Sequence, residues 1–480
     1  MPDQEVSKGP PPLLPHGGQW ARQPPTTSLP VAPQRLSPLS PIVRAGRAFL
    51  GLLTILTAEG ASTAGRGGGA SFVPDYFVVG LAVVLGVISW YMTTWRVDGD
   101  SLQVASGLIR RRTIRVPLSR VQAVDLAEPL LARILGLAEV RVRTAGGKDG
   151  DARLMYLKLE EADRVRGGLL ALVHGLPQTT PPPPERPLLR GSNRRLVASN
   201  LLTGAFLASV VALAIPVVLL SSGKVGAAVI GASGGTLVLD LFAVVSRMVR
   251  RVASEWGFEV AEAPDGLRIR CGFASRVAET IPYGRVQAIR MLEPLWWRSL
   301  GWCRLELHLA GGVAKGRNQP RAAIRRALLP VGTRAEAEML LGRILADHAI
   351  TVTPPPRRAM WRAPLSYHFL AAGKNPSCAM SVGGRVCRLT EWIPMAKVQS
   401  IRYTQGPLQR ALDLASVQLD VAGHRARAHW SHRSSKEANA LMAVLPDECR
   451  VARDWEASTG SSAHGPGPMA TAHLSPPPPA

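Results

Sequence analysis

Two histidines offer the combination of side chains best suited to metal chemistry in this chain. His429 and His432 are three residues apart, a spacing that would place both on one face of a helix, and neutral imidazole is a common metal ligand. A metal site needs further ligands, and Glu437 is the only carboxylate close to the pair in the sequence. We therefore expect no metal site.

Catalytic motifs are also missing from the sequence. It contains no GxSxG turn, HExxH pair, Walker loop or dinucleotide-binding glycine pattern, and the glycine-rich run 65–69 does not follow a strand. The five cysteines are odd in number and form no CxxC pair, so we expect reduced thiols rather than a zinc site or disulfides. These observations favour a non-enzymatic protein with no cofactor and no small-molecule substrate.

A short segment occurs three times and organises the chain. Each copy has a proline, two further residues, a cation and Val-Gln, and the copies begin at Pro117, Pro282 and Pro394. A similar arginine-containing segment and an alternating, strand-like segment follow in every copy. Internal repetition at this level indicates three copies of one module.

The repeated cation of each copy has two interpretations. The residue, which is Arg120, Arg285 or Lys397, could satisfy backbone groups at a strand end. It could instead contact a lipid phosphate or an acidic protein surface through charge-assisted hydrogen bonds. Both interpretations remain open from the sequence, but the valine that follows each cation is expected to point into the module.

Two other sequence features are candidates for contact with lipid or a protein partner. The run Arg110-Arg111-Arg112 lies on a predicted hairpin close to an apolar segment, where basic residues could meet lipid headgroups. The pair Trp296-Trp297 could form an exposed aromatic contact or could equally fill the interior of its module.

Alternating apolar residues predict antiparallel strands in every module. Gly107, Gly272 and Gly384 each lie ten residues before the repeated proline, at an equivalent hairpin position that accommodates positive φ. Helix-like segments follow the last strands at 160–173, 334–345 and 436–445. Several antiparallel strands closed by one C-terminal helix are therefore expected in each copy.

This pattern resembles the bacterial PH domains of the membrane-flanked type. The resemblance implies tandem PH-like β-barrels beside transmembrane hairpins. The third copy departs from the pattern, because it has Asp413 in place of the later glycine, Lys397 for the arginine and no hairpin before it. In the first copy the matching residues are Gly107, Leu108, Arg111, Val116, Pro117, Arg120, Val121 and Gln122.

Four apolar segments are candidates for membrane spans. Residues 72–92, 201–220 and 225–245 each approach the roughly 20 residues that a spanning helix needs, and 42–58 is shorter. They form two predicted hairpins, 42–92 and 201–245. Arginines cluster outside both hairpins and are scarce in the connecting loops, so the positive-inside rule places both termini and all three modules in the cytoplasm.

The predicted fold class is a membrane protein with two transmembrane helical hairpins and three cytoplasmic PH-like β-barrel domains, each closed by a C-terminal helix. Proline-rich stretches mark the boundaries between the parts. The expected parts are a disordered arm at 1–40, the hairpin region 41–94, module 1 at 95–176, a linker at 177–198, the hairpin region 199–247, module 2 at 248–348, a linker at 349–360, the divergent module 3 at 361–448 and a disordered tail at 454–480.

The net charge of +23 is compatible with nucleic acid or with a membrane surface. No helix-turn-helix or finger spacing is present, so we expect no nucleic-acid partner and only weak binding to anionic lipids. Two functions remain: a non-enzymatic scaffold in the cell membrane that binds a protein partner or assembles with itself, and a component of a transport or export system. Ionisable residues are rare within the apolar segments, with Asp240 the clear instance, which favours the scaffold.

Overall fold

The repeated Pro-x-x-cation segment links two sets of three antiparallel strands in each module of the computed structural model. In all three copies it forms a short 3-10 helix that starts after the proline and ends at the cation, and extended backbone resumes at the valine. The structure describes residues 33–40, 84, 87–88, 91–98, 101–106, 112–144, 152–173, 185–221, 227–264, 266–309, 325–345, 347–422 and 427–460.

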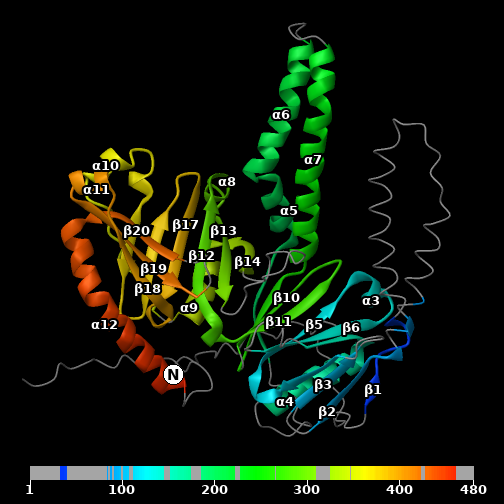
Figure 1. The fold of residues 1–480 in the computed structure, drawn as a ribbon. Helices are drawn as coiled ribbons and strands as arrows, with labels where there is room; N and C mark the ends of the chain where they lie inside the picture. Colours follow the sequence, from blue (N-terminus) through cyan, green and yellow to red (C-terminus); the bar gives the residue numbers. More distant parts are fainter. Residues whose placement is uncertain are drawn as a thin grey trace, which may run out of the picture.

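The strands and helices follow the same order in each module (Figure 1). Module 1 consists of β2 (Thr94–Asp98), β3 (Ser101–Ser106), β4 (Arg112–Pro117), η1 (Leu118–Arg120), β5 (Val121–Glu128), α3 (Leu130–Ile134), β6 (Leu137–Thr144), β7 (Ala152–Lys158) and α4 (Leu159–Val173). Module 2 consists of β9 (Glu259–Ala263), β10 (Gly266–Cys271), β11 (Arg276–Ile281), η2 (Tyr283–Arg285), β12 (Val286–Pro294), α8 (Leu295–Arg298), β13 (Trp302–Leu309), β14 (Arg325–Thr333) and α9 (Arg334–Ile344).

Module 3 retains the complete arrangement despite its divergent sequence. It consists of β15 (Ala371–Lys374), β16 (Cys378–Gly383), β17 (Cys387–Pro394), η5 (Met395–Lys397), β18 (Val398–Thr404), α11 (Pro407–Ala411), β19 (Leu414–Val421), β20 (Arg427–Ser434) and α12 (Ser435–Gly460), and it is preceded by α10 (Ala359–Arg362) and η4 (Tyr367–Phe369). Asp413 adopts φ of +53°, a left-handed conformation that Gly136 and Gly301 adopt at the equivalent positions.

The valine after each repeated cation points into the core of its module. Val121, Val286 and Val398 are 7%, 2% and 3% exposed, and each belongs to a separate apolar cluster. The turn glycines are required by the backbone: φ is +110° at Gly272 and +88° at Gly384, and a Cβ at either would collide with a backbone oxygen. The predicted inward position of the valine is therefore confirmed in all three modules. The predicted glycine turn is confirmed in modules 2 and 3.

Neighbouring modules are joined by continuous β-sheet. The edge strand β11 of module 2 pairs with β5 of module 1, and β17 of module 3 pairs with β12 of module 2. The register is the same at both junctions, because Ala278 lies opposite Leu126 and the equivalent Thr390 lies opposite Met291. The three modules thus form one array rather than separate units on flexible linkers (Figure 1).

A helical hairpin projects from the array between modules 1 and 2 in sequence (Figure 1). It comprises α5 (Asn193–Leu201), α6 (Gly204–Ser221) and α7 (Ala227–Glu255), and α6 lies along α7. Ser209 on α6 donates a hydrogen bond of 2.8 Å to Asp240 on α7. In the part of the chain that the structure describes, no single helix has the length and apolarity to cross a membrane. The bent pair Asn193–Leu201 and Gly204–Ala212, with a 45° break, meets these two criteria only when its helices are taken together.

The ordered regions extend beyond the expected boundaries. In the expected arm, β1 (Gln34–Arg35) pairs with β2, and Leu36 is 4% exposed within the core of module 1. In the expected linker, β8 (Arg186–Arg190) pairs with β9. At the other end of the chain, α12 continues into the expected tail. These edge strands are short and contain or adjoin proline, so they lack the periodicity that identifies a strand in sequence. The predicted spans 42–58 and 72–92 lie almost wholly outside the described residues.

Candidate functional site

The three repeated cations do not share one environment. Lys397 forms an ion pair with Glu456 on α12, which fixes the long C-terminal helix against η5. Arg285 is half-buried, and Arg120 is exposed at the end of η1. A recognition site repeated in all three modules would present the three cations in the same way, so this arrangement supports a structural role at least for Lys397.

The two adjacent tryptophans have different roles. Trp297 is 2% exposed, packs with Leu196 and Val331, and donates its indole N–H to the backbone oxygen of Ser199 at 3.2 Å. Trp296 is 52% exposed on the same short helix. Of the predicted pair, one residue therefore attaches α5 to module 2 and the other is available to contact a partner.

The remaining candidates from the sequence do not form a site in the described residues. Arg110 and Arg111 lie outside them, and Arg112 begins β4 with a side chain that is not described. His429 and His432 lie on β20 rather than on a helix, so they do not share a helical face. Burial lowers the pKa of both imidazoles. No group of three or more potential metal ligands occurs among the described side chains.

The first junction between modules is held by a buried ionic bridge. Arg143 on β6 contacts Asp125 on β5 at 2.8 Å and Glu279 on β11 at 2.8 Å. The two carboxylates belong to different modules and are almost fully buried, and Asp125 also accepts a hydrogen bond from the backbone N–H of Thr280. One guanidinium therefore bridges carboxylates from both sides of the junction.

The second junction replaces this bridge with a direct ion pair. Arg290 on β12 lies opposite Glu391 on β17, and the side chains, only 12% and 8% exposed, are joined by a charge-assisted hydrogen bond of 2.7 Å. Glu391 is the residue of module 3 that corresponds to Glu279 of module 2. The incoming strand thus brings a carboxylate to the same position in both junctions.

A second contact at the junctions is also repeated. Arg133 donates a hydrogen bond of 2.9 Å to the backbone oxygen of Phe273, and Arg298 donates one of 2.8 Å to the backbone oxygen of Arg385. Each arginine lies sixteen residues after its repeated proline, and each acceptor directly follows the turn glycine of the next module. We refer to these two contacts as the junction clasps. They explain why the arginine and the glycine recur at fixed spacing.

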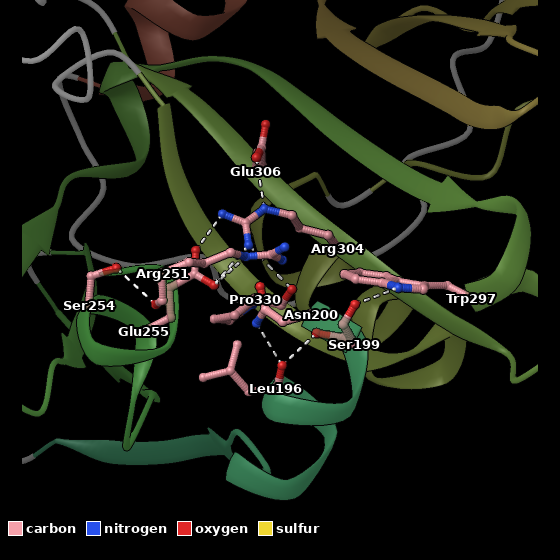
Figure 2. A network of polar contacts seen from close by, with 10 residues as sticks. All are labelled: Leu196, Ser199, Asn200, Arg251, Ser254, Glu255, Trp297, Arg304, Glu306 and Pro330. Atoms are coloured by element: carbon pink, nitrogen blue, oxygen red, sulfur yellow. Dashed lines mark hydrogen bonds and ion pairs between the residues drawn. The ribbon is translucent and has the colours of Figure 1, made fainter. Parts of the chain in front are cut away.

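The base of the helical hairpin is attached to module 2 by a buried network (Figure 2). Glu255, at the end of α7, accepts hydrogen bonds of 2.6 and 3.0 Å from Arg304 on β13 and one of 3.2 Å from Arg251. Arg304 also donates to Glu306 at 2.8 Å and to the backbone oxygen of Pro330. One carboxylate and one guanidinium thus connect α7 to two strands of the sheet.

The charges in this network stabilise one another against the cost of burial. Burial alone would raise the pKa of the Glu255 carboxyl, but Arg304 and Arg251 outweigh that effect and hold the pKa below its ordinary value. Burial would likewise lower the pKa of Arg304, but Glu255 and Glu306 raise it. The guanidinium of Arg251 lies 5.6 Å from the ring centre of Trp297, a cation–π distance. The network is therefore ionised at neutral pH.

Short helices expose apolar side chains at the end of the array from which the hairpin projects. In Figure 1, α8, α10 and α11 lie on the same side as α6 and α7. Trp296 on α8, Trp361 on α10 and Leu408 on α11 are 52%, 81% and 52% exposed. Two of these three exposed side chains are tryptophans.

Comparison with known proteins agrees with this architecture. The family described as Bacterial PH domain matches residues 52–173, 201–347 and 384–448, which together exceed half of the chain. The UPF0699 transmembrane protein YdbT of Bacillus subtilis (strain 168) is 28% identical to this chain over 85 residues. That similarity covers 18% of this chain and 17% of the relative, well below two thirds of the relative's length. With three matched segments and three modules of one fold, the chain belongs to the bacterial PH domain family.

Proposed function

We propose that the protein is a multi-pass membrane scaffold whose three PH-like modules form a rigid, non-enzymatic array on the cytoplasmic surface. The observation that carries this proposal is the attachment of α7 to β13 through Glu255 and Arg304. A buried ion pair between a hairpin and a module fixes their relative orientation, which a flexible tether would not need. The continuous sheet extends the same fixed orientation to modules 1 and 3.

The proposed topology has the hairpin 201–245 and the hairpin 42–92 crossing the bilayer. Arginines on both sides of the described hairpin, including Arg194, Arg247 and Arg250, support a cytoplasmic base. Single-cysteine variants test this orientation. A membrane-impermeant maleimide should label Ser62→Cys and Ser222→Cys in intact cells, and should label Ser119→Cys and Ser275→Cys only after permeabilisation; the reverse pattern would refute the proposal.

We further propose that the exposed ends of α8, α10 and α11 touch the lipid surface. The apolar side chains there are flanked by arginines, including Arg298, Arg362 and Arg410. Each basic residue near an anionic surface adds about 1 kcal/mol at most, and salt screens the attraction. Lipid contact is therefore auxiliary to the spanning helices, and a single headgroup type is not selected.

The alternative, a component of a transport or export system, rests on Asp240 within the hairpin. Its carboxylate accepts a hydrogen bond from Ser209 on the facing helix, an arrangement that serves helix–helix packing. If the protein is a scaffold, the Asp240→Asn variant should bind the same partners in membranes as the unmodified protein. Crosslinking followed by identification of both proteins and lipids would measure this directly.

A further inference from the structure

The core of module 3 is less covered on one side than the cores of modules 1 and 2. In module 2, Ile289 and Met291 on β12 are 0% and 4% exposed, because residues of the incoming β17 cover them. The equivalent residues of module 3, Ile401 and Tyr403 on β18, remain half-buried. In the described part of the chain β18 is an edge strand, and such a strand presents a row of backbone groups for pairing.

The two internal junctions show what an incoming strand must supply. The equivalent segments are Ala278-Glu279-Thr280 in β11, of which Ala278 is the last residue paired with β5, and Thr390-Glu391-Trp392 in β17, all of which pairs with β12. In each, a central glutamate meets an arginine of the preceding module. The flanking side chains pack toward the preceding core, since Ala278 and Trp392 belong to the apolar clusters of modules 1 and 2.

Module 3 retains the residues that would receive such a strand. Arg402 occupies the position of Arg290, and its side chain is 61% exposed although it contacts Asp420 at 3.1 Å. Arg410 occupies the position of the clasp arginines Arg133 and Arg298, and it is exposed. β18 therefore offers a cation for a central carboxylate, and α11 offers a clasp for the turn that precedes the strand.

Among the described strands, the equivalent edge of a second copy of this chain does not match β18. That edge is β4, where the register of the internal junctions would place Thr113, Ile114 and Arg115 against β18. That segment has no carboxylate for Arg402, and Arg115 would lie against Ile401. A charged residue against the apolar Ile401 and a cation without a carboxylate are both unfavourable, so this register favours a different partner.

We propose that β18 binds an extended strand of a partner protein by antiparallel sheet extension, with a carboxylate of that strand opposite Arg402 and apolar side chains against Ile401 and Tyr403. This mode of recognition gains affinity from main-chain hydrogen bonds and specificity from alternate side chains. The proposal rests on the scaffold function and names the class of partner: a protein with an exposed edge strand that carries an acidic residue between apolar or small ones.

The test uses purified full-length protein in detergent and a hairpin peptide that copies residues 378–394, with both cysteines replaced by serine. A photoreactive benzophenone residue at the position of Leu389 should crosslink near Thr404. Arg402→Glu should weaken binding of this peptide by about tenfold or more, a change of about 1.4 kcal/mol. A peptide carrying Glu391→Arg should bind the Arg402→Glu variant better than it binds the unmodified protein.

Arg334→Glu, at an exposed arginine of α9 that also has a carboxylate partner, is the matched control and should leave peptide binding unchanged. Absence of binding, crosslinks that map away from β18, or equal binding to the Arg402→Glu variant would overturn the proposal. So would crosslinking of Thr113→Cys in one copy to Tyr403→Cys in another, because a second copy would then occupy the edge. Cysteine labelling tests the topology independently, so failure of the peptide assay alone would leave the membrane scaffold intact.

Discussion

Arg298 donates a hydrogen bond to the backbone oxygen of Arg385, so that an arginine of module 2 holds the turn of module 3. Because this clasp closes a turn at the edge of the sheet, Arg298→Ala is expected to loosen the turn locally at a cost of about 1 kcal/mol. Hydrogen exchange of residues 384–387 should become faster in the variant. Arg357→Ala, which removes an exposed arginine elsewhere, should leave this segment unchanged, and unchanged exchange in Arg298→Ala would show that the clasp contributes nothing.

The ion pair between Arg290 and Glu391 should be sensitive to the loss of either partner. Both side chains are largely buried, so Glu391→Ala, which removes a carboxylate that Arg290 contacts, is expected to destabilise the junction by about 3–5 kcal/mol. The exchange Arg290→Glu with Glu391→Arg should recover much of this loss in thermal unfolding. The exposed pair Arg334–Glu338 serves as the control, and its loss should cost less than about 1 kcal/mol. Equal effects at the two pairs would contradict the buried junction.

The base of the hairpin should weaken in acid because of Glu255. Its folded-state pKa is held below the ordinary value of about 4.3, so the stabilisation is complete above that value and is lost as pH falls through the folded-state pKa. Glu255→Gln removes the titrating group. The difference in stability between unmodified protein and this variant should therefore shrink from about pH 7 to about pH 3.

The matched control for this pH dependence is Glu338→Gln, at an exposed carboxylate on α9. This variant should unfold much like the unmodified protein at every pH. A gap between unmodified protein and Glu255→Gln that stays constant on acidification would show that the Glu255 charge does not stabilise the attachment of α7 to β13.

Contact between α10 and lipid predicts a specific fluorescence change. Trp361 is 81% exposed on the side of the hairpin, whereas Trp455 is 52% exposed on α12, which runs away from that side (Figure 1). In liposomes with brominated lipids, Trp361→Phe should reduce the fraction of tryptophan fluorescence that is quenched. Trp455→Phe should not reduce it, and a loss of quenching in the Trp455 variant alone would place the lipid on the opposite side.

The sequence predicted the interior of each module better than the joints between modules. Period-two alternation and the repeated valine depend on local burial, so Val121, Val286 and Val398 were assigned correctly to the cores. Pairing between β5 and β11 joins residues about 150 positions apart, and no local pattern specifies which edge strands meet. The recurring Arg133 and Arg298 were visible as a repeat, but their acceptors are backbone oxygens that leave no trace in residue type.

The candidate site shows the same limit. Trp296 and Trp297 are adjacent and chemically identical, and only the position of α5 decides that one is buried and the other exposed. The network of Glu255, Arg304 and Glu306 was not identified from the sequence. Glu255 is 49 residues from Arg304 in the chain, and all three residues belong to types that usually face solvent. The sequence feature that could have indicated this network is a charged residue at the end of an apolar segment, such as Glu255.

The central claim is that the modules form one array by edge-strand pairing in a repeated register, and disulfide trapping in native membranes tests it most directly. The experiment uses a background without the native cysteines and places two cysteines at directly opposite positions of each junction. The first pair is Ala127→Cys with Val277→Cys, and the second is Leu292→Cys with Leu389→Cys. We predict that both pairs form disulfides, whereas Leu292→Cys with Arg388→Cys, one residue out of register, does not. Failure of both direct pairs, or equal trapping of the out-of-register pair, would contradict a continuous array.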